Sequence, residues 1–413
     1  MLYTFNFNNS EEAMIKRAGG FTLIELLITM VIFVLVIAAG SQIFTGLLTQ
    51  FKQQSKIAET NIEGIVGLEM LRQDIEHSGY GLPWNGLITY SESAANPFNL
   101  NDSTTTAVPR AIVSMNNATF SSPNDIFDGS DYLVIKAVNI ARNAASEKWT
   151  VLKAAPFTSP YNPRLWTPTL SPPLGEDFEG SDRVIVLSMG ATTSTERRLI
   201  VDSTPKFYET YNNITPSSPW PPPDTTETRI IYGINTSTAN TPTRPFNRAD
   251  YMIRRPATNM PSRCAQNTGI LYKAIMAHDG SGSYDYLPLL DCVADMQVVY
   301  GVDQNTPVDG VVDCYTNNLA DVLGTVDAPN IRDRVREVRV YILAHEGQID
   351  RNFTFNPPIA PSSIRVGQPS AEVPGGSCTG ILLGRDFNLS GIPDWQNYRW
   401  KVYTLVVKPN NLR

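Results

Sequence analysis

The residues of this chain that most clearly point to chemistry lie near its N-terminus, where Glu25 interrupts an apolar run. The run extends from Phe21 to Gly40 and follows directly on the pair Gly19-Gly20. An ionised carboxylate at bilayer depth costs roughly 2.5 to 3.5 kcal/mol, so such a residue is expected to have a partner and a function. A cut after Gly20 would create a cationic amine at Phe21. In a low dielectric that amine and the Glu25 carboxylate, of the same or a neighbouring subunit, would attract each other strongly.

This pattern resembles the class III signal of type IV prepilins, with a short polar leader, a glycine pair and then Phe-Thr-Leu-Ile-Glu-Leu over residues 21–26. The resemblance implies that a prepilin peptidase removes the leader, residues 1–20, by cleaving between Gly20 and Phe21. It also implies N-methylation of the new terminus at Phe21 and a role for Glu25 in assembly. A removed leader takes no part in the fold.

Two simpler interpretations compete with this one. An ordinary secretory signal also combines basic residues with an apolar segment, and Ala38-Ala39-Gly40 could serve as its cleavage site. A plain membrane anchor would need only the apolar length, because residues 21–48 can cross about 30 Å of hydrocarbon. Neither interpretation accounts for the glycine pair before the run or for Glu25 within it.

Four further segments resemble the blocks of the PilW family of minor pilins, at residues 71–80, 289–303, 335–343 and 398–407. This resemblance implies a minor pilin that is incorporated into a type IV pilus at its tip, where it helps to prime pilus assembly. The implied partners are the major pilin, other minor pilins, the inner-membrane assembly platform, a tip adhesin and, before assembly, membrane lipid. The implied location is the bacterial inner membrane, as a single-pass protein with its head in the periplasm, and then the pilus at the cell surface.

Other functions stay open at this stage. A type II secretion pseudopilin of the tip complex carries the same signal, and a pilus-borne adhesin or ligand-binding head could use the same stalk. A membrane-tethered enzyme is disfavoured, because the chain has only three histidines and no His-Glu-x-x-His, Gly-x-Ser-x-Gly, phosphate-loop or dinucleotide motif. Nucleic-acid binding is disfavoured by the net charge of −7 and the lack of basic clusters.

A long helix is predicted from Phe21 to Gly79, with a transmembrane segment at about 21–48. Two apolar stripes keep the helical spacing of three and four residues. The first contains Phe44, Leu47, Leu48, Phe51, Ala58, Ile62, Ile65 and Val66, and the second contains Ile57, Leu68, Leu71 and Ile75. Two stripes predict two partners, a globular head and neighbouring subunits. Gly79 is the expected C-terminal cap, with Pro83 beyond it.

Beyond Gly79 the apolar pattern changes to the alternation of strands, which predicts an α+β fold: a long N-terminal pilin helix packed on a large, mainly antiparallel β-rich head. The expected strands are residues 110–115, 131–138, 182–189, 197–202, 228–234, 270–276, 296–302, 335–344 and 398–407. A proline-rich segment at 216–223 is the expected boundary between a first lobe, 80–215, and a second lobe, 225–413.

The second lobe contains all four cysteines, Cys264, Cys292, Cys314 and Cys378. An even number of cysteines in an exported chain predicts two disulfides, and four cysteines allow three connectivities. The absence of a Cys-x-x-Cys pair disfavours zinc binding and thiol exchange. Four reduced, buried thiols are the alternative.

One local pattern predicts a metal site, and Ca2+ is the one candidate cofactor; none is expected to be required. Oxygen ligands at positions 1, 3, 5, 7 and 9 of a loop with Gly391 at position 6 follow the calcium loop of EF-hands. The candidate ligands are Asp386, Asn388, Ser390, the carbonyl of Ile392, and Asp394. Position 12 is Asn397, where a bidentate Glu is usual. The alternative is a metal-free polar loop built on an Asx-turn.

Overall fold

The computed structural model describes residues 20–86, 88–92, 100–102, 108–120, 126–159, 161, 177–190, 196–236, 241–279, 281–368 and 376–412. Residues 1–19 of the predicted leader lie outside this range. The chain divides into two compact units, Met1–Ser55 and Lys56–Arg413. The second unit contains every strand of the described residues.

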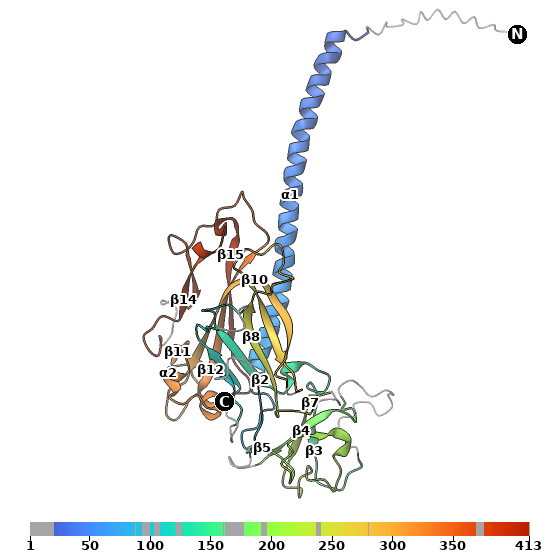
Figure 1. The fold of residues 1–413 in the computed structure, drawn as a ribbon, viewed down its shortest axis with the longest axis vertical. Helices are drawn as coiled ribbons and strands as arrows, with labels where there is room; N and C mark the ends of the chain where they lie inside the picture. Colours follow the sequence, from blue (N-terminus) through green and yellow to red (C-terminus); the bar gives the residue numbers. More distant parts are fainter. Residues whose placement is uncertain are drawn as a thin grey trace, which may run out of the picture. The chain divides into compact units, whose positions relative to one another are not determined.

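The first element, α1, is a helix of 54 residues, Leu23–Glu76 (Figure 1). Its stretch Leu23–Ala58 is long and apolar enough to cross a membrane, with a mean hydropathy of 2.8 in its most apolar part. The helix ends where the sequence predicts. The His77 N–H donates to the carbonyl of Gln73 in a last helical bond, and Gly79 then takes a left-handed φ of +83°. Glycine reaches this conformation without a steric penalty from a Cβ, which explains the stop.

The head is organised around an eight-stranded antiparallel sheet in the order β1-β2-β8-β9-β10-β12-β15, with β11 paired to β10. The bounds are β1 (Ile112–Met115), β2 (Tyr132–Ala137), β8 (Asn247–Arg254), β9 (Gly269–Met276), β10 (Tyr284–Val302), β11 (Cys314–Thr316), β12 (Val335–Glu346) and β15 (Arg399–Val407). Strand β10 is the longest, and β-bulges interrupt its pairing with β9 and with β12. The mainly antiparallel β-rich head is therefore confirmed.

Two smaller sheets complete the head. The first has five strands, β3 (Trp149–Leu152), β4 (Arg183–Met189), β5 (Glu196–Leu199), β6 (Glu209–Thr210) and β7 (Arg229–Asn235). The second pairs β13 (Ser363–Gly367) with β14 (Gly384–Asn388). Short helical segments lie between strands: η2 (Asn139–Ala141), η3 (Tyr211–Asn213), α2 (Ala320–Leu323), α3 (Ala328–Arg334), η4 (Leu389–Gly391) and η5 (Trp395–Asn397).

The predicted division into lobes 80–215 and 225–413 is wrong. Strands from both sides of residues 216–223 share each of the two larger sheets, since β2 pairs with β8 and β4 pairs with β7. The proline-rich segment is an anchored loop rather than a linker. The Trp220 side chain is buried, and the Arg229 guanidinium donates to the carbonyls of Pro219, Trp220 and Pro221 at 2.8 to 3.0 Å.

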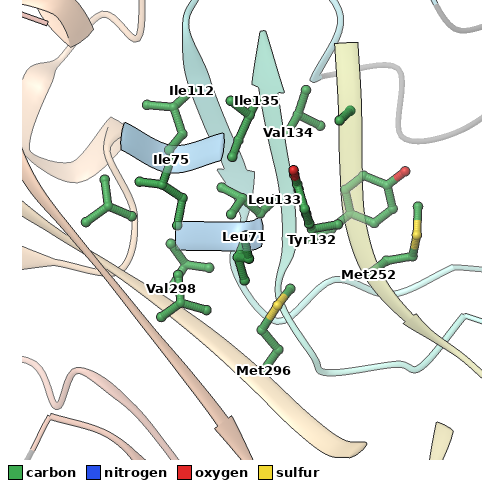
Figure 2. Close-up of a cluster of buried hydrophobic side chains, with 14 of the residues drawn as sticks. Leu71, Ile75, Ile112, Tyr132, Leu133, Val134, Ile135, Met252, Met296 and Val298 are labelled. Atoms are coloured by element: carbon green, nitrogen blue, oxygen red, sulfur yellow. The ribbon is translucent and has the colours of Figure 1, made fainter. Parts of the chain in front are cut away.

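The second apolar stripe of α1 packs on the eight-stranded sheet. Leu71 and Ile75 are fully buried and lie among side chains of β1, β2 and β10, including Ile112, Leu133 and Val298 (Figure 2). Alternate residues of β10 point to the opposite face, where Val299 joins a cluster with side chains of β13, β14 and η4. The central strands are thus covered on both faces, which explains their nearly continuous apolar sequence.

Two glycines of α1 lie close to β10 within Lys56–Arg413. A Cβ on Gly67 would lie 1.9 Å from the carbonyl oxygen of Leu289, and one on Gly64 would lie 2.9 Å from a methyl carbon of Leu290. At Gly67 the neighbouring atoms belong to the main chain, so only a residue without a side chain lets the helix approach β10 so closely. At Gly64 the neighbouring atom is the end of the Leu290 side chain, which can move aside. Gly67 therefore has a packing role.

Candidate functional site

The N-terminal end of α1 is closed by a reciprocal pair of hydrogen bonds between Thr22 and Glu25. The Glu25 N–H donates to Thr22 Oγ1 at 3.3 Å, and the Thr22 N–H donates to Glu25 Oε2 at 2.9 Å. The Thr22 hydroxyl also donates to Oε2 at 2.9 Å. This arrangement is a capping box, in which each side chain satisfies a backbone N–H that the first helical turn leaves without a partner.

The capping box was not predicted, although its sequence signature, Thr-x-x-Glu before an apolar run, is present at residues 22–25. It gives Glu25 a local structural role beside its predicted pairing with the Phe21 amine. None of the three bonds uses Oε1, so the same carboxylate can accept from a second donor. Gly20 and Phe21 precede the helix and are exposed, with Phe21 85% accessible.

The apolar side chains of α1 within Met1–Ser55 are exposed throughout. They include Ile24, Leu26, Leu27, Ile28, Val31, Phe33, Leu35, Ile37, Phe44, Leu47 and Phe51. Leaving such side chains in water forgoes about 1.5 to 3 kcal/mol for each that could be fully buried. This part of the helix therefore needs an apolar environment, either lipid or other helices.

The first apolar stripe continues into the head unit without being covered there. Ile62, Ile65 and Val66 are 61 to 65% exposed, whereas Leu68, Leu71 and Ile75 on the second stripe are buried. The prediction of two helix faces with different partners is confirmed for the face that packs on the head. The outer face remains available for an apolar partner. Ile62 and Val66 also line an open groove with Leu287 to Asp291 of β10.

An ion pair fixes the last turns of α1 to the sheet. The Asp74 carboxylate accepts from Lys273 Nζ at 2.7 Å and from the hydroxyl of Tyr251, and all three side chains are buried. Burial raises the pKa of Tyr251 well above its usual range, and the neighbouring Asp74 charge adds to this effect. Tyr251 thus stays a hydrogen-bond donor, and the pair sets the position of the helix end.

A second set of buried charges lies where β2 and β8 meet the segment containing Glu92 and Asp102. Lys136 Nζ lies 2.9 Å from Glu92 and also contacts Asp102, while the Arg248 guanidinium bonds Glu92 at 2.8 Å. The Arg248 Nε also donates to Asp250 at 2.7 Å. Burial disfavours the ionised form of Glu92, but Lys136 and Arg248 outweigh it and lower the pKa of Glu92 to about 2.

The four cysteines lie at disulfide distance in two pairs, Cys264–Cys292 and Cys314–Cys378, with Cα–Cα distances of 4.8 and 5.0 Å. This selects one of the three connectivities that the sequence leaves open. The first pair ties the loop before β9 to β10, and the second ties β11 to the segment before β14. Both pairs lie in the C-terminal part of the head.

The residues of the predicted calcium loop are spread over a strand and two helical turns. Asp386 and Asn388 belong to β14, Ser390 and Ile392 lie in and after η4, and Asp394 precedes η5. Asp386 Oδ1 accepts from Arg365 at 3.1 Å, and Asn388 Oδ1 accepts from the Ser390 N–H and the Ser362 hydroxyl. In this arrangement Asp386 therefore contacts a protein cation, and Asn388 Oδ1 already accepts two hydrogen bonds.

The hydrogen bond from the Ser390 N–H to the Asn388 side chain is an Asx-type cap. Such a cap is what the metal-free interpretation of this loop predicts. Among the described residues no group of three His, Cys, Asp or Glu side chains could hold a metal ion.

Calcium binding stays a prediction that thermal melting can test. If calcium binds, a chelator lowers the melting temperature of the wild type and leaves that of Asp386→Ala unchanged. Identical melting curves for the wild type and Asp386→Ala, each measured with and without chelator, would dismiss the site.

Comparisons with known proteins agree with these features. Residues 250–411 match the family model PilW, type IV Pilus-assembly protein W, and residues 15–41 match the prokaryotic N-terminal methylation motif. A type IV-like pilin from Thermus thermophilus is similar at 14% identity over 41% of this chain and 68% of that one, with a TM-score of 0.22. That structural similarity is too low to carry an argument. No curated protein matches the chain.

The PilW match begins within β8 and covers β9, β10, β12 and β15 together with both cysteine pairs. The methylation motif includes Gly20, Phe21 and the capping box. These matches indicate a structural pilus component rather than an enzyme. The chain is a type IV pilin-like minor pilin, with a prepilin-type motif at its N-terminus and a PilW domain over residues 250–411.

Proposed function

We propose that this protein is processed by prepilin peptidase between Gly20 and Phe21, methylated at Phe21, and incorporated into a type IV pilus at its tip, where it helps to prime assembly. Before assembly it is a single-pass inner-membrane protein with its head in the periplasm. The observation that carries the proposal is the apolar face of α1, exposed along the helix and still open at Ile62, Ile65 and Val66. Neighbouring pilin helices are the partners that would cover it.

The size of the head supports a place at the tip. At least 393 residues follow Gly20, most of them in the head. A bulky subunit is difficult to repeat along a filament wall, whereas at the tip few neighbours crowd it. Other minor pilins, the major pilin, the assembly platform and a tip adhesin are the proposed partners.

Mass spectrometry of the mature protein tests the processing step. The expected N-terminal peptide begins with N-methyl-Phe21. An intact Met1 or a terminus at Ser41 would contradict the proposal.

The role of the Glu25 charge can be separated from its role in the capping box. Glu25→Gln keeps a capping side chain, because Gln also serves at this position, but removes the charge. Thr22→Ala removes the cap but keeps the charge, and a lost cap typically costs about 1 kcal/mol. If Glu25 pairs with the Phe21 amine during assembly, Glu25→Gln lowers the amount of this protein in sheared pili at least tenfold, and Thr22→Ala lowers it much less.

Immunoblots of sheared pili and of membranes measure this difference, with the membrane level as the control for expression. Equal losses for the two variants would assign Glu25 to helix capping alone. Normal incorporation of Glu25→Gln would remove it from the assembly step altogether.

A type II secretion pseudopilin of the tip complex is the second candidate, because the same N-terminal motif serves both filaments. A deletion strain separates the two. Loss of piliation that the intact gene restores is expected for the pilus. Normal pili together with lost protein secretion would favour the pseudopilin.

A further inference from the structure

A polar pocket of about 440 Å³ lies beside the end of α1, away from the exposed stripe of that helix. Its lining residues come from the last turns of α1, from η2 and from β3 with the segment before it: Gln73, Asp74, His77, Tyr80, Asn139, Arg142, Glu147 and Trp149. The volume lies within the range of about 300 to 1,000 Å³ that is usual for small-molecule sites. All of these residues belong to the unit Lys56–Arg413.

The polar groups of the pocket are held in place by the protein itself. Arg142 follows η2 with a left-handed φ of 52°, and its guanidinium lies 3.5 Å from Asp74 Oδ1 and 3.2 Å from Gln73 Oε1. The other oxygen of Asp74 is fixed by Lys273 and Tyr251. Donors and acceptors that are already oriented cost little entropy when a ligand binds.

The negative charges at the pocket are matched by positive charges in or next to it. Of the lining residues, Asp74 and Glu147 supply two carboxylates and Arg142 supplies a guanidinium, while the buried Lys273, which does not line the pocket, pairs with Asp74. An anionic ligand such as a phosphate would meet two like charges, and a metal ion would meet the guanidinium. The balance favours an uncharged ligand that both donates and accepts hydrogen bonds.

The wall of the pocket is aromatic. Trp149 begins β3, an edge strand of the five-stranded sheet, and the residue is 38% exposed. The Tyr80 ring is oriented by edge contacts with Tyr232 and His77, whose ring centres lie 5.5 and 6.4 Å away. Aromatic rings next to amide, carboxylate and guanidinium groups suit a ligand with apolar C–H faces and hydroxyl edges.

We propose that this pocket binds an uncharged sugar ring, as a monosaccharide or as one unit of a glycan. Trp149 stacks on the C–H face of the ring, while Arg142, Gln73 and Glu147 hydrogen-bond its hydroxyls. This inference does not depend on assembly into a pilus, because no pocket residue belongs to the exposed stripe of α1. A subunit that fails to enter pili would still bind the sugar.

The test uses the full chain in lipid nanodiscs, because sugar-headed detergents would compete for the pocket. The probes are glucose, galactose, N-acetylglucosamine, N-acetylgalactosamine, lactose and chitobiose, followed by saturation-transfer NMR and calorimetric titration. Saturable binding of at least one probe is expected. Trp149→Ala should weaken that binding at least tenfold, and Trp149→Phe should retain most of it.

Tyr286→Ala is the matched control, because Tyr286 is an aromatic residue of similar exposure, 40%, that does not line the pocket. It should leave binding unchanged. Thermal melting checks that each variant is folded, and Glu147→Gln gives a second, exposed variant that should weaken binding without disturbing the core. No saturable binding of any probe, or binding that Trp149→Ala leaves intact, would overturn the proposal.

Discussion

At the scale of single residues, Gly67 decides how closely α1 approaches the sheet. Its backbone lies against the main chain of Leu289, which cannot move aside as a flexible side chain could. Gly67→Ala should therefore force α1 and β10 apart and destabilise the head by about 1 to 3 kcal/mol, the usual cost of overpacking. Denaturant unfolding of the purified protein, followed by circular dichroism, measures the change.

Gly46 provides the control for this substitution. It lies in the same helix, and no described atom beyond its neighbours would come within 4 Å of an added Cβ. Gly46→Ala should leave the stability of the head unchanged and raise helix propensity by up to about 1 kcal/mol. Equal effects of both substitutions would show that helix propensity, and not the contact with Leu289, determines the result.

At the scale of elements, the end of α1 is held by the buried pair of Asp74 with Lys273. Asp74→Ala leaves the Lys273 ammonium buried without its carboxylate, and breaking such a pair typically costs about 3 to 5 kcal/mol. The helix end should loosen from β8 and β9. Hydrogen exchange of the last turns of α1 and the free energy of unfolding measure this effect.

The control for Asp74→Ala is Glu69→Ala, because Glu69 pairs with Arg72 on the exposed surface of the same helix. Glu69→Ala should change stability little, because solvent screens exposed pairs and the freed Arg72 stays hydrated. A small effect of Asp74→Ala, similar to that of Glu69→Ala, would mean that the helix end is held by apolar packing alone.

Most helices and strands could be predicted from local sequence patterns. The strands that were not predicted show what such patterns lack. The long helix, its end at Gly79 and the strands of alternating apolar residues were predictable. Strand β8 was not, because Arg248 and Asp250 resemble a polar loop until their partners from distant segments are known. The first half of β10 was missed for a similar reason, since Pro288 and two bulges interrupt its alternation.

Some residues of the candidate sites could likewise be predicted from local sequence patterns, and others could not. Gly20, Phe21 and Glu25 lie within six consecutive residues of the sequence, so their motif could be read directly. The capping box shares that local signature and could have been found. The pocket beside α1 combines residues 73–80 with residues 139–149, and only the fold brings them together. The cysteine pairing likewise depends on where β10 and β11 lie.

At the scale of the whole molecule, the charges buried between β2, β8 and the segment of Glu92 couple the stability of the head to pH. Glu92 has an ordinary pKa of 4.5 in the unfolded chain and about 2 in the folded protein. The unfolded chain therefore binds the proton first as pH falls. The contribution of Glu92 to stability is fully present above pH 4.5 and is lost as pH falls from about 4.5 to about 2.

A pKa difference of this size corresponds to about 3 kcal/mol. Urea unfolding at a series of pH values should show that loss in the wild type. Glu92→Gln should be less stable at pH 7, because Lys136 and Arg248 lose a carboxylate, and its stability should fall less steeply between pH 4.5 and 2. Parallel pH profiles for the two proteins would show that other carboxylates control acid unfolding, and that the Glu92 contacts do not link the segment before β1 to the rest of the head.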